Sequence, residues 1–395
     1  HRHFRRQRQM CIRDSSMAFS VWRRTPSKFD GVVKTSNLGF SSIISPRLRS
    51  LRTAYGRRPL VKKGTLCGCN MTQVHQGVET SLDSLRQKID ESLEQMIASR
   101  IDSGEVVELS GKVLLAGGKR LRPIMMCLSY QIAGGDDLTE IMPLAMAFEF
   151  LHTATLVHDD INDGATHRRG VPTIHETAGL SKAIIAGDWL FVQGYALGGQ
   201  YNQDIVTNIA NCCSSIAVSE FSQIDHIQNL KTSPEDYISI VKGKTAGPFS
   251  SGCRSAGVVA KATEEELNAL EEFGVEIGIA YQLVDDLLDL IGDELMGKPR
   301  GCDVLEGKMT LPLIHSLTLS HGKDRERLAD IINNFDDSLF DELIELLTKS
   351  DSFNYTKILI RNHFDRALRY LEIFPESSAK SLLKTVAEYS TTRKL

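Results

Sequence analysis

The stretch TEIMPLAMAFEFLHTATLVHDDIND, residues 139–163, decides the fold expected for this chain. It is largely apolar, reads as one helix, and ends in three aspartates, Asp159, Asp160 and Asp163. Residues four apart share a helical face, so Asp159 and Asp163 are expected to point the same way. At a helix C-terminus, where the dipole is already negative, two such carboxylates repel each other unless a cation lies between them.

The same design recurs in YQLVDDLLDLIGD, residues 281–293, where the aspartates are Asp285, Asp286 and Asp289. Asp293 adds one more carboxylate at a spacing of four. The residues between the aspartates, such as Leu287 and Leu288, are too apolar for a freely exposed surface helix, which argues against a simple solvated acidic face. Two such helix ends facing each other predict a cage of hard oxygen ligands, which suits magnesium and a diphosphate bound between the ends.

Two basic clusters accompany the aspartates. GGKRLRP, residues 117–123, places Lys119, Arg120 and Arg122 at a turn before a helix, and HRRG places Arg168 and Arg169 just after the first aspartate motif. An arginine fork binds phosphate through two hydrogen bonds, whereas lysine acts as a point charge. The clusters therefore predict a diphosphate site, and the net charge near -18 of residues 71–395 opposes nucleic acid as the alternative ligand.

Helical periodicity continues on both sides of the two motifs. From Glu79 onward, apolar residues recur at steps of three and four, and turn signals such as Gly134-Gly135-Asp136-Asp137 separate the segments. Alternating strand-like patterns are nearly absent. The sequence predicts an all-α protein, a single large helical bundle around a central active-site cavity. The expected helices lie near residues 120–133, 139–158, 181–198, 204–227, 233–246, 263–292, 324–349 and 353–372.

Charge divides the chain near residue 70. Residues 1–70 carry 16 of the 46 lysines and arginines but only two acids, Asp14 and Asp30. We expect a basic, disordered N-terminal extension over 1–70 and one catalytic domain over 71–395. The extension has the composition of an organellar transit peptide, yet MCIRDS at 10–15 resembles the translation of a sequencing-library adapter. A start at Met71, which we favour, predicts a cytoplasmic protein, whereas a start at Met17 leaves a targeting segment for mitochondrion or plastid.

Other composition features narrow the class of protein. No continuous apolar run reaches the 18 residues of a membrane span, so we expect no transmembrane segment, and any membrane contact would be peripheral, for product release. The eight cysteines show neither zinc-ligand spacing nor the density of a secreted disulfide scaffold. A reduced compartment inside the cell fits this cysteine usage.

Taken together, the motifs resemble those of the trans-isoprenyl diphosphate synthases, or polyprenyl synthetases, from about Leu82 to about Tyr389. The resemblance implies a prenyltransferase that joins isopentenyl diphosphate head to tail to an allylic diphosphate, on an all-α fold that is usually a homodimer. The matching segments are GGKRLRP at 117–123, DDIND at 159–163, RRG at 168–170, AGDWLF at 186–191, KTA at 244–246, and DDLLD at 285–289 followed by GK and EGKMTLP. The last segment adds Asp303 and Lys308.

The resemblance also implies roles for individual residues. Three magnesium ions per active site would grip the allylic diphosphate on Asp159, Asp160, Asp163, Asp285, Asp286 and Asp289, with Arg168, Lys244 and Lys298 adding positive charge. Isopentenyl diphosphate would bind Lys119, Arg122, His152 and Arg169. Thr245 and Gln282 would stabilise the allylic cation, and the released diphosphate would take up the proton, so no protein nucleophile is required.

Product length depends on the helix that precedes the first aspartate motif. In the family that it resembles, bulky aromatic residues four or five positions before the motif stop chain growth early, but here those positions are Thr155 and Ala154. Leu151, with Phe148 and Phe150 near it, is a candidate for a deeper floor. We expect a product of twenty carbons or more, that is, geranylgeranyl diphosphate or a longer polyprenyl diphosphate.

Two alternatives remain open at the level of sequence. A class I terpene cyclase also ionises an allylic diphosphate, although it needs neither a second full aspartate motif nor a separate basic site. A noncatalytic regulatory subunit of a prenyl synthase would be expected to have lost ligands, yet all six motif aspartates are present.

Overall fold

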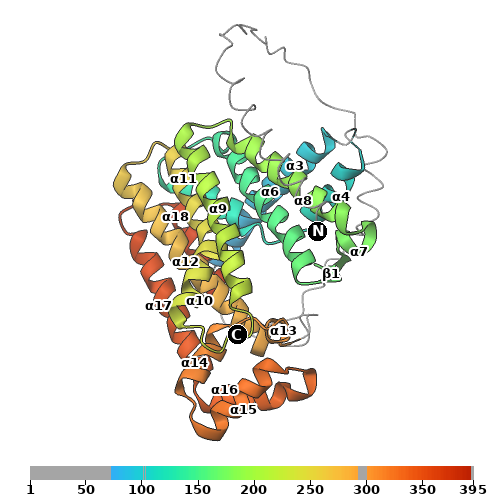
Figure 1. The fold of residues 1–395 in the computed structure, drawn as a ribbon. Coiled ribbons are helices and arrows are strands. Elements are labelled where there is room, and N and C mark those ends of the chain that lie inside the picture. Colours follow the sequence, from blue (N-terminus) through green and yellow to red (C-terminus); the bar gives the residue numbers. More distant parts are fainter. Residues whose placement is uncertain (1–72, 101, 103, 292–299, 393–395) are drawn as a thin grey trace, which may run out of the picture. The chain divides into compact units, whose positions relative to one another are not determined.

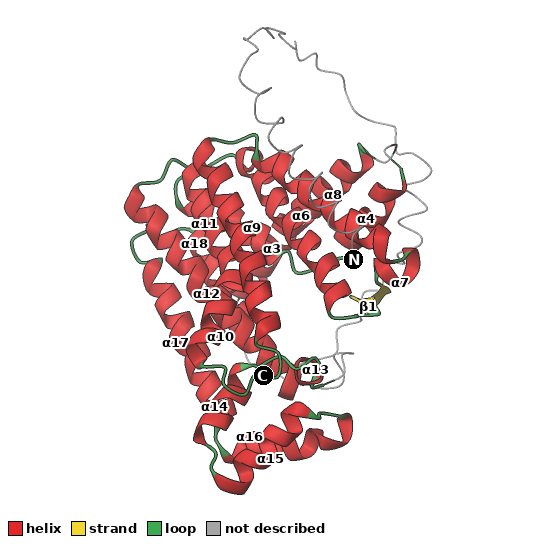
Figure 2. Ribbon diagram, in the orientation of Figure 1, coloured by secondary structure: helices red, strands yellow, loops and turns green. Residues whose placement is uncertain are grey.

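The structure is a computed structural model, and it describes residues 73–100, 102, 104–291 and 300–392. Within these ranges the regular structure is helical except for one two-stranded antiparallel ribbon, β1 (His167–Arg168) and β2 (Val171–Pro172) (Figures 1 and 2). The all-α prediction is confirmed. The predictions on residues 1–70, including the start codon and the cellular location that depends on it, lie outside the described residues and stay predictions.

The helices follow the chain in three groups. The first group is α3 (Gln73–Ala98), α4 (Glu105–Leu115), α5 (Leu121–Ile132), α6 (Leu138–Asn162), α7 (Ile174–Ala178), α8 (Leu180–Gly198) and α9 (Gln203–Asp225). The second is α10 (Pro234–Val241), the π turn η2 (Lys242–Ala246), α11 (Gly247–Val259) and α12 (Glu264–Ile291). The third is α13 (Cys302–Leu305), α14 (Leu311–Leu319), α15 (Gly322–Asn333), η4 (Asp337–Leu339), α16 (Phe340–Lys349), α17 (Ser352–Tyr370) and α18 (Ser378–Thr391).

Helix α6 is a core helix with apolar residues around most of its circumference. It is capped by Asp137, whose side chain accepts a hydrogen bond from the Thr139 amide at 2.9 Å. By length and composition alone it is apolar enough to cross a membrane, although it contains no continuous apolar run of 18 residues. However, 67% of its most apolar 18-residue stretch is buried inside the protein, so packing in the bundle accounts for the hydrophobicity of the helix.

Helix α12 joins two core clusters. Its first half belongs to the cluster that contains residues of α5, α6, α11 and α17, and its second half belongs to the cluster that contains residues of α10, η2 and α14. Two glycines let it approach its neighbours closely: a Cβ on Gly278 would lie 2.4 Å from Cα of Ala246, and a Cβ on Gly274 would lie 2.5 Å from Cα of Ser250. Because those atoms are backbone, the π turn η2 and the start of α11 lie directly against α12.

The predicted helix over 233–246 is real, but it is not uniform. It begins with a capping box, in which Ser233 Oγ accepts from the Asp236 amide at 3.1 Å and Asp236 accepts from the Ser233 amide at 3.0 Å. After α10 the chain makes the π turn η2 before continuing as α11. Such π turns are frequent at functional sites, and this one carries Lys244 and Thr245.

Candidate active site

Each aspartate of the first motif has a cationic partner from a different part of the chain. Asp159 lies 3.7 Å from Lys244 Nζ on η2, and Asp163 lies 3.3 Å from Lys308 Nζ, which follows α13. Asp160 accepts a hydrogen bond from Arg168 Nε. The carboxylates of Asp159 and Asp163 remain about a quarter exposed, so they line the surface of the site while Asp160 is buried beneath it.

The end of α6 explains why Arg168 reaches Asp160. The chain leaves the helix at Gly164, whose positive φ of 63° suits a glycine after a helix end. It then forms the β1–β2 ribbon, which turns at Arg169 and Gly170. This ribbon folds the basic segment that follows the motif back onto the motif itself.

The three aspartates of the second motif lie in three different environments. Asp285 is exposed. Asp286 is buried and accepts hydrogen bonds from Tyr237 at 2.5 Å and from Gln282 at 2.8 Å. Asp289 accepts from the backbone amides of Cys302 and Asp303, both at 3.1 Å, and so caps α13.

Two connections bring the aspartate motifs together. On η2, Lys244 contacts Asp159 of the first motif, while the neighbouring Thr245 donates to Gln282 Oε1 at 2.8 Å, next to the second motif. On the opposite connection, Lys308 contacts Asp163, and Asp303 interacts electrostatically with the second-motif aspartates and with Lys308. The sequence prediction that the two helix ends lie close together therefore agrees with the described contacts.

The electrostatics of this region indicate an excess of carboxylate. Burial raises the pKa of Asp159, although Lys244 acts in the opposite direction, and burial likewise raises the pKa of Asp160. Burial raises the pKa of Asp286 to about 7, and burial together with the nearby aspartates raises the pKa of Asp303. Because these shifts penalise the charged forms, the protein's own cations do not fully compensate the cluster.

The carboxylate oxygens of the two motifs suit a magnesium ion that also binds water and substrate better than an ion coordinated by protein side chains alone. Among the described residues, no three acidic, histidine or cysteine side chains converge closely enough to hold an ion by themselves. Magnesium commonly takes only one or two carboxylates and completes its shell with water and substrate phosphate. The exposed Asp285 and the half-buried Asp159 and Asp163 present oxygens suited to such a bridging ion.

The basic site lies around His152 on α6. Burial, and then the charges of Arg122, Arg169, Arg168 and Arg120 in that order, lower the pKa of His152 well below its usual value, so all four positive charges act on this imidazole. The guanidinium carbon of Arg122 lies over the Phe249 ring, 4.6 Å from its centroid. Its Nε is buried with no hydrogen-bond partner in the part of the chain that the structure describes.

Two of these arginines, Arg122 and Arg169, are candidates for binding an anion. Arg169 donates to the carbonyl of Gly117, and its guanidinium lies against Gly118, where a Cβ would come within 3.0 Å of it. Within the described ranges neither Arg122 nor Arg169 forms an ion pair with a carboxylate. Arg122 is half-buried and Arg169 is exposed, and a guanidinium without an acidic partner is a ready site for a phosphate anion.

Arg120, by contrast, is an anchor for the loop. Its side chain is buried and donates to Asp90 at 2.8 Å, to Glu149 at 2.5 Å and to the Leu114 carbonyl at 2.7 Å. It adopts the left-handed conformation at φ 50° as the N-cap of α5. All three donor atoms serve the protein, so Arg120 fixes the turn that presents its neighbours to the site.

Of the remaining predicted residues, Lys119 is described by the structure and Lys298 is not. Lys119 Nζ lies 5.6 Å from the centroid of the Tyr389 ring of α18. Lys298 lies outside the described residues, so its role stays a prediction. Sequence reasoning missed Tyr237, and it missed Glu220 and Gln223 of α9, which both contact Lys244 Nζ, the latter at 3.2 Å. None of the three belongs to a motif with a recognisable spacing, so the sequence carried no signal for them.

A surface hollow of about 610 Å³ lies elsewhere, at the start of α6. It is lined by polar residues of α3 and the α5–α6 turn, among them Lys88, Gln95 and Asp137, and contains none of the predicted site residues. Because the aspartates lie at the other end of α6, the hollow is separate from the candidate active site.

An all-α bundle with two aspartate-bearing helix ends, joined through lysines and set near unpaired guanidinium groups, defines a metal-dependent enzyme acting on diphosphates. The polyprenyl synthetase family model matches residues 105–347. A short chain isoprenyl diphosphate synthase of Methanothermobacter thermautotrophicus is 32% identical over 321 residues, 79% of this chain and 98% of that protein. The chain belongs to the polyprenyl synthetase family and is a prenyltransferase.

Solved structures agree with this assignment. The geranylgeranyl pyrophosphate synthetase of Pyrococcus horikoshii matches with a TM-score of 0.76 and 30% identity, covering 82% of this chain and all of that one (100%). A polyprenyl synthase from Caulobacter crescentus, complexed with calcium and isoprenyl diphosphate, matches with a TM-score of 0.74 and 31% identity, covering 80% and 97% of the two chains. Enzymes of this family use a divalent metal ion and isoprenyl diphosphate substrates. Family membership argues against the terpene cyclase alternative.

Proposed function

We propose that the enzyme condenses isopentenyl diphosphate with allylic diphosphates and releases an all-trans product of twenty carbons or more. The observation that carries this proposal is the presence of two unlike diphosphate sites. One is rich in carboxylates and requires added cations, whereas the other contains Arg122 and Arg169, neither of which forms an ion pair with a carboxylate among the described residues. One substrate bound through metal and one bound directly to arginine match these two sites.

The residues divide the chemical work. Magnesium, when bound, would neutralise the departing diphosphate and so lower the barrier to its ionisation. Lys244, Lys308 and Arg168 lie beside the carboxylates and supply further positive charge at the leaving group. Gln282 Oε1 and the Thr245 hydroxyl present oxygen dipoles near the resulting allylic cation. Attack by the isopentenyl double bond forms the new carbon–carbon bond, and the released diphosphate accepts the proton.

We further propose three magnesium ions per site, with Asp159, Asp163 and Asp285 as their most accessible protein ligands. The carboxylates of Asp160, Asp286 and Asp289 already accept hydrogen bonds from protein donors, so they would contribute mainly by shaping the first group. Titration of the protein with Mg²⁺ in the presence of a non-hydrolysable allylic diphosphate, followed by calorimetry, would give the stoichiometry.

The function is tested by incubating the purified enzyme with Mg²⁺, isopentenyl diphosphate and primers of five, ten and fifteen carbons. The expected result is linear product longer than the farnesyl primer, with no reaction in the presence of EDTA. Cyclic hydrocarbon formed without consumption of isopentenyl diphosphate would instead identify a cyclase. No turnover with any primer would favour a noncatalytic subunit.

Helical geometry supports a deep product channel along α6. Thr155, His152 and Phe148 lie four, seven and eleven residues before Asp159, hence on the same face of the helix. Thr155 donates its hydroxyl to the His152 carbonyl at 2.8 Å, so it offers the channel a methyl group. The first bulky apolar side chain that these positions place on that face is Phe148, roughly 16 Å along the helix from Asp159.

Phe148 is the floor that we propose for this channel. A Cβ on Gly252 of α11 would lie 3.6 Å from Phe148 and 3.1 Å from Met126 of α5, so these residues meet on the α11 side. Leu151 packs instead against Gly194 of α8, and the Phe150 ring lies 6.3 Å from the Trp189 ring, also on α8. Of the three floor residues considered from sequence, Phe148 alone shares the face of Asp159.

Phe148→Ala is therefore expected to shift the product distribution to longer chains, because removing the ring deepens the channel. Phe150→Ala is the matched control: it deletes an equally buried ring from the opposite face of the same helix, at a similar stability cost of about 3–5 kcal/mol. Products are compared by chromatography at a temperature where circular dichroism finds both variants folded. Longer products from both variants, or from neither, would rule out this floor.

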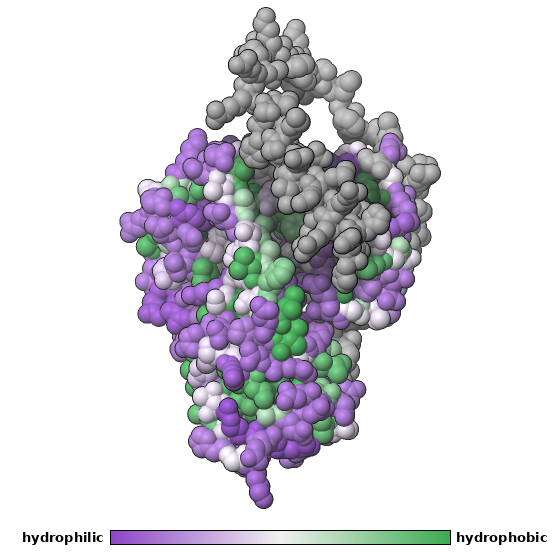
Figure 3. All heavy atoms as spheres, in the orientation of Figure 1, coloured by the Kyte–Doolittle hydropathy of each residue, from purple (hydrophilic) through white to green (hydrophobic). Residues whose placement is uncertain are grey.

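We also propose that the enzyme is a homodimer that buries an apolar face of α8 and α9. On α9, Val218, Phe221 and Ile224 are 67%, 74% and 50% exposed, and on the adjacent α8, Ile185 and Val192 are 56% and 60% exposed. Figure 3 shows apolar side chains gathered over α9. Exposed apolar groups at this density are typical of an interface.

Phe221→Asp is expected to convert the dimer to a monomer in light scattering after size exclusion, because it would place a charge within the buried face. Ile358→Asp on α17 replaces an apolar side chain that is also exposed, at 52%, and is expected to leave the mass unchanged. A monomeric wild-type enzyme, or a dimer that survives Phe221→Asp, would contradict the proposed interface.

A further inference from the structure

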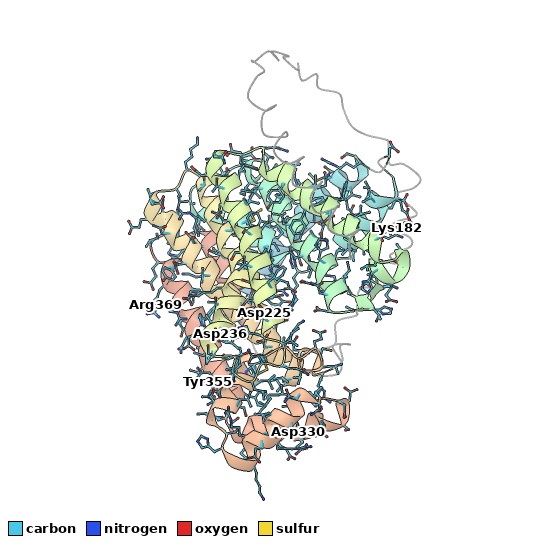
Figure 4. The ribbon with its side chains drawn as sticks, viewed as in Figure 1. Lys182, Asp225, Asp236, Asp330, Tyr355 and Arg369 are labelled. Atoms are coloured by element: carbon cyan, nitrogen blue, oxygen red, sulfur yellow. The ribbon has the colours of Figure 1, made fainter. Side chains whose placement is uncertain are left out.

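Tyr237 is a buried tyrosine whose hydroxyl lies at the second aspartate motif. It is the fourth residue of α10, directly after Asp236 of the capping box, which Figure 4 labels. Its ring belongs to the core cluster formed with α12 and α14, and only 6% of the residue is exposed. The capping box fixes the start of α10, and the hydrogen bond to Asp286 fixes where the hydroxyl points.

The hydroxyl begins a continuous chain of hydrogen bonds that ends at the π turn. Tyr237 donates to Asp286 Oδ2 at 2.5 Å, and Gln282 Nε2 donates to Asp286 Oδ1 at 2.8 Å. Thr245 in turn donates to Gln282 Oε1 at 2.8 Å. Both oxygens of the Asp286 carboxylate are thus occupied by protein donors from α10 and α12.

This chain determines which way the Gln282 amide faces. Because Asp286 accepts from Gln282 Nε2 and Gln282 Oε1 accepts from Thr245, the amide nitrogen faces Asp286 and the amide oxygen faces Thr245. The oxygen is the negative end of the amide dipole, the end that stabilises a developing cation. If the carboxylate were free to rotate, the amide could turn its positive end toward the site.

We propose that Tyr237 is a positioning residue for the condensation: through Asp286 it holds the Gln282 amide with its oxygen toward Thr245 and the reacting carbons. This inference rests on the proposed function and deepens it. Tyr237 itself contacts no reacting atom, and its effect on the reaction passes through two other side chains. Because the chain of bonds is buried, each bond restricts the next one.

Tyr237→Phe tests the proposal, because it removes one oxygen and keeps the ring. The expected result is a kcat lower by about tenfold to a hundredfold at saturating Mg²⁺ and substrates, as for loss of a hydrogen bond to a charged group. The KM for isopentenyl diphosphate is expected to stay within about twofold, since the arginine site is untouched. Both constants are measured well below the melting temperature of the variant.

Tyr130→Phe is the matched control. Tyr130 is also a buried tyrosine that donates to a carboxylate, Glu140, at 2.8 Å, but it lies on α5 outside the candidate site. It removes the same kind of bond, and it is expected to leave kcat unchanged. A loss of kcat common to both variants would assign the effect to stability alone and overturn the proposal.

A double-mutant cycle then tests the route through Gln282. In a Gln282→Ala background, Tyr237→Phe is expected to lower kcat no further, because the side chain that it positions is gone. A further loss of the full factor would show that Tyr237 acts by another route, and a wild-type kcat in the single variant would overturn the proposal directly. A wild-type enzyme without condensation activity would instead refute the proposed function.

Discussion

Asp159→Ala and Asp285→Ala are each expected to lower kcat by about a thousandfold or more, the largest effect predicted for this enzyme. Each change removes one of the accessible carboxylates to which the leaving diphosphate would be bound through magnesium. The two aspartates come from different helix ends, yet the losses are expected to be similar because one bound group requires both. Steady-state kinetics at saturating Mg²⁺ measures the effect.

The same Asp159→Ala variant is expected to keep or raise its melting temperature. Burial raises the pKa of Asp159, which means that the ionised carboxylate destabilises the folded state at neutral pH. Removing that charge relieves the repulsion from Asp163 and Glu220. Loss of activity with retained stability is the signature of a site built for ligands rather than for folding.

Asp330→Asn provides the control for both aspartate variants. Asp330 lies on α15 (Figure 4), is 55% exposed at its side chain and pairs only with the nearby Arg327 among the described ion pairs. Its loss is expected to leave kcat unchanged. Near-normal turnover in Asp159→Ala or Asp285→Ala would refute the proposed metal site.

Gly278→Ala is expected to have the second largest effect, on stability and activity together. A Cβ at this position would lie 2.4 Å from Cα and 2.8 Å from Cβ of Ala246. The backbone of Ala246 cannot change rotamer as a flexible side chain can, so α12 and η2 would have to move apart. Overpacking of this kind costs about 1–3 kcal/mol or more. Since η2 carries Lys244 and Thr245, we also expect the folded variant to lose at least about tenfold in kcat.

Gly111→Ala is the matched control for this glycine. It is also a buried helical glycine, but the nearest atom to its Cβ would be the Ile97 Cγ2 at 3.0 Å, in a side chain that can shift. Alanine is the better helix former, so the melting temperature is expected to change little. Thermal denaturation and kcat are compared for the two variants. A Gly278→Ala enzyme as stable and active as Gly111→Ala would contradict the close contact of α12 with η2.

Much of the fold was predictable because helical periodicity is local. Apolar residues at steps of three and four predicted most of the helices, and Asp137 and Ser233 mark two helix starts by residue type alone. The π turn, by contrast, lies within residues 233–246, for which the sequence predicted one helix. Its geometry depends on contact with α12, for which no local pattern exists.

The candidate site was predictable in its residue types and less so in its partners. The repeated aspartates and the arginines that follow the first motif predicted a diphosphate site. No sequence pattern predicted, however, that Glu220 and Gln223 of α9 would contact Lys244. These residues come from a helix whose position is fixed by packing, so their proximity could not be predicted from spacing.

The sequence by itself determined the class of helices, the two carboxylate-bearing helix ends and their charge, because each of these depends on neighbours within a few residues. Only the tertiary structure decided the role of residues that are adjacent in sequence. Asp285 is exposed while the adjacent Asp286 is buried against Tyr237; two positions apart, Arg120 anchors a loop while Arg122 Nε has no hydrogen-bond partner among the described residues. Consecutive helical residues point about 100° apart, and the packing of the other helices determines which direction meets solvent, core or substrate.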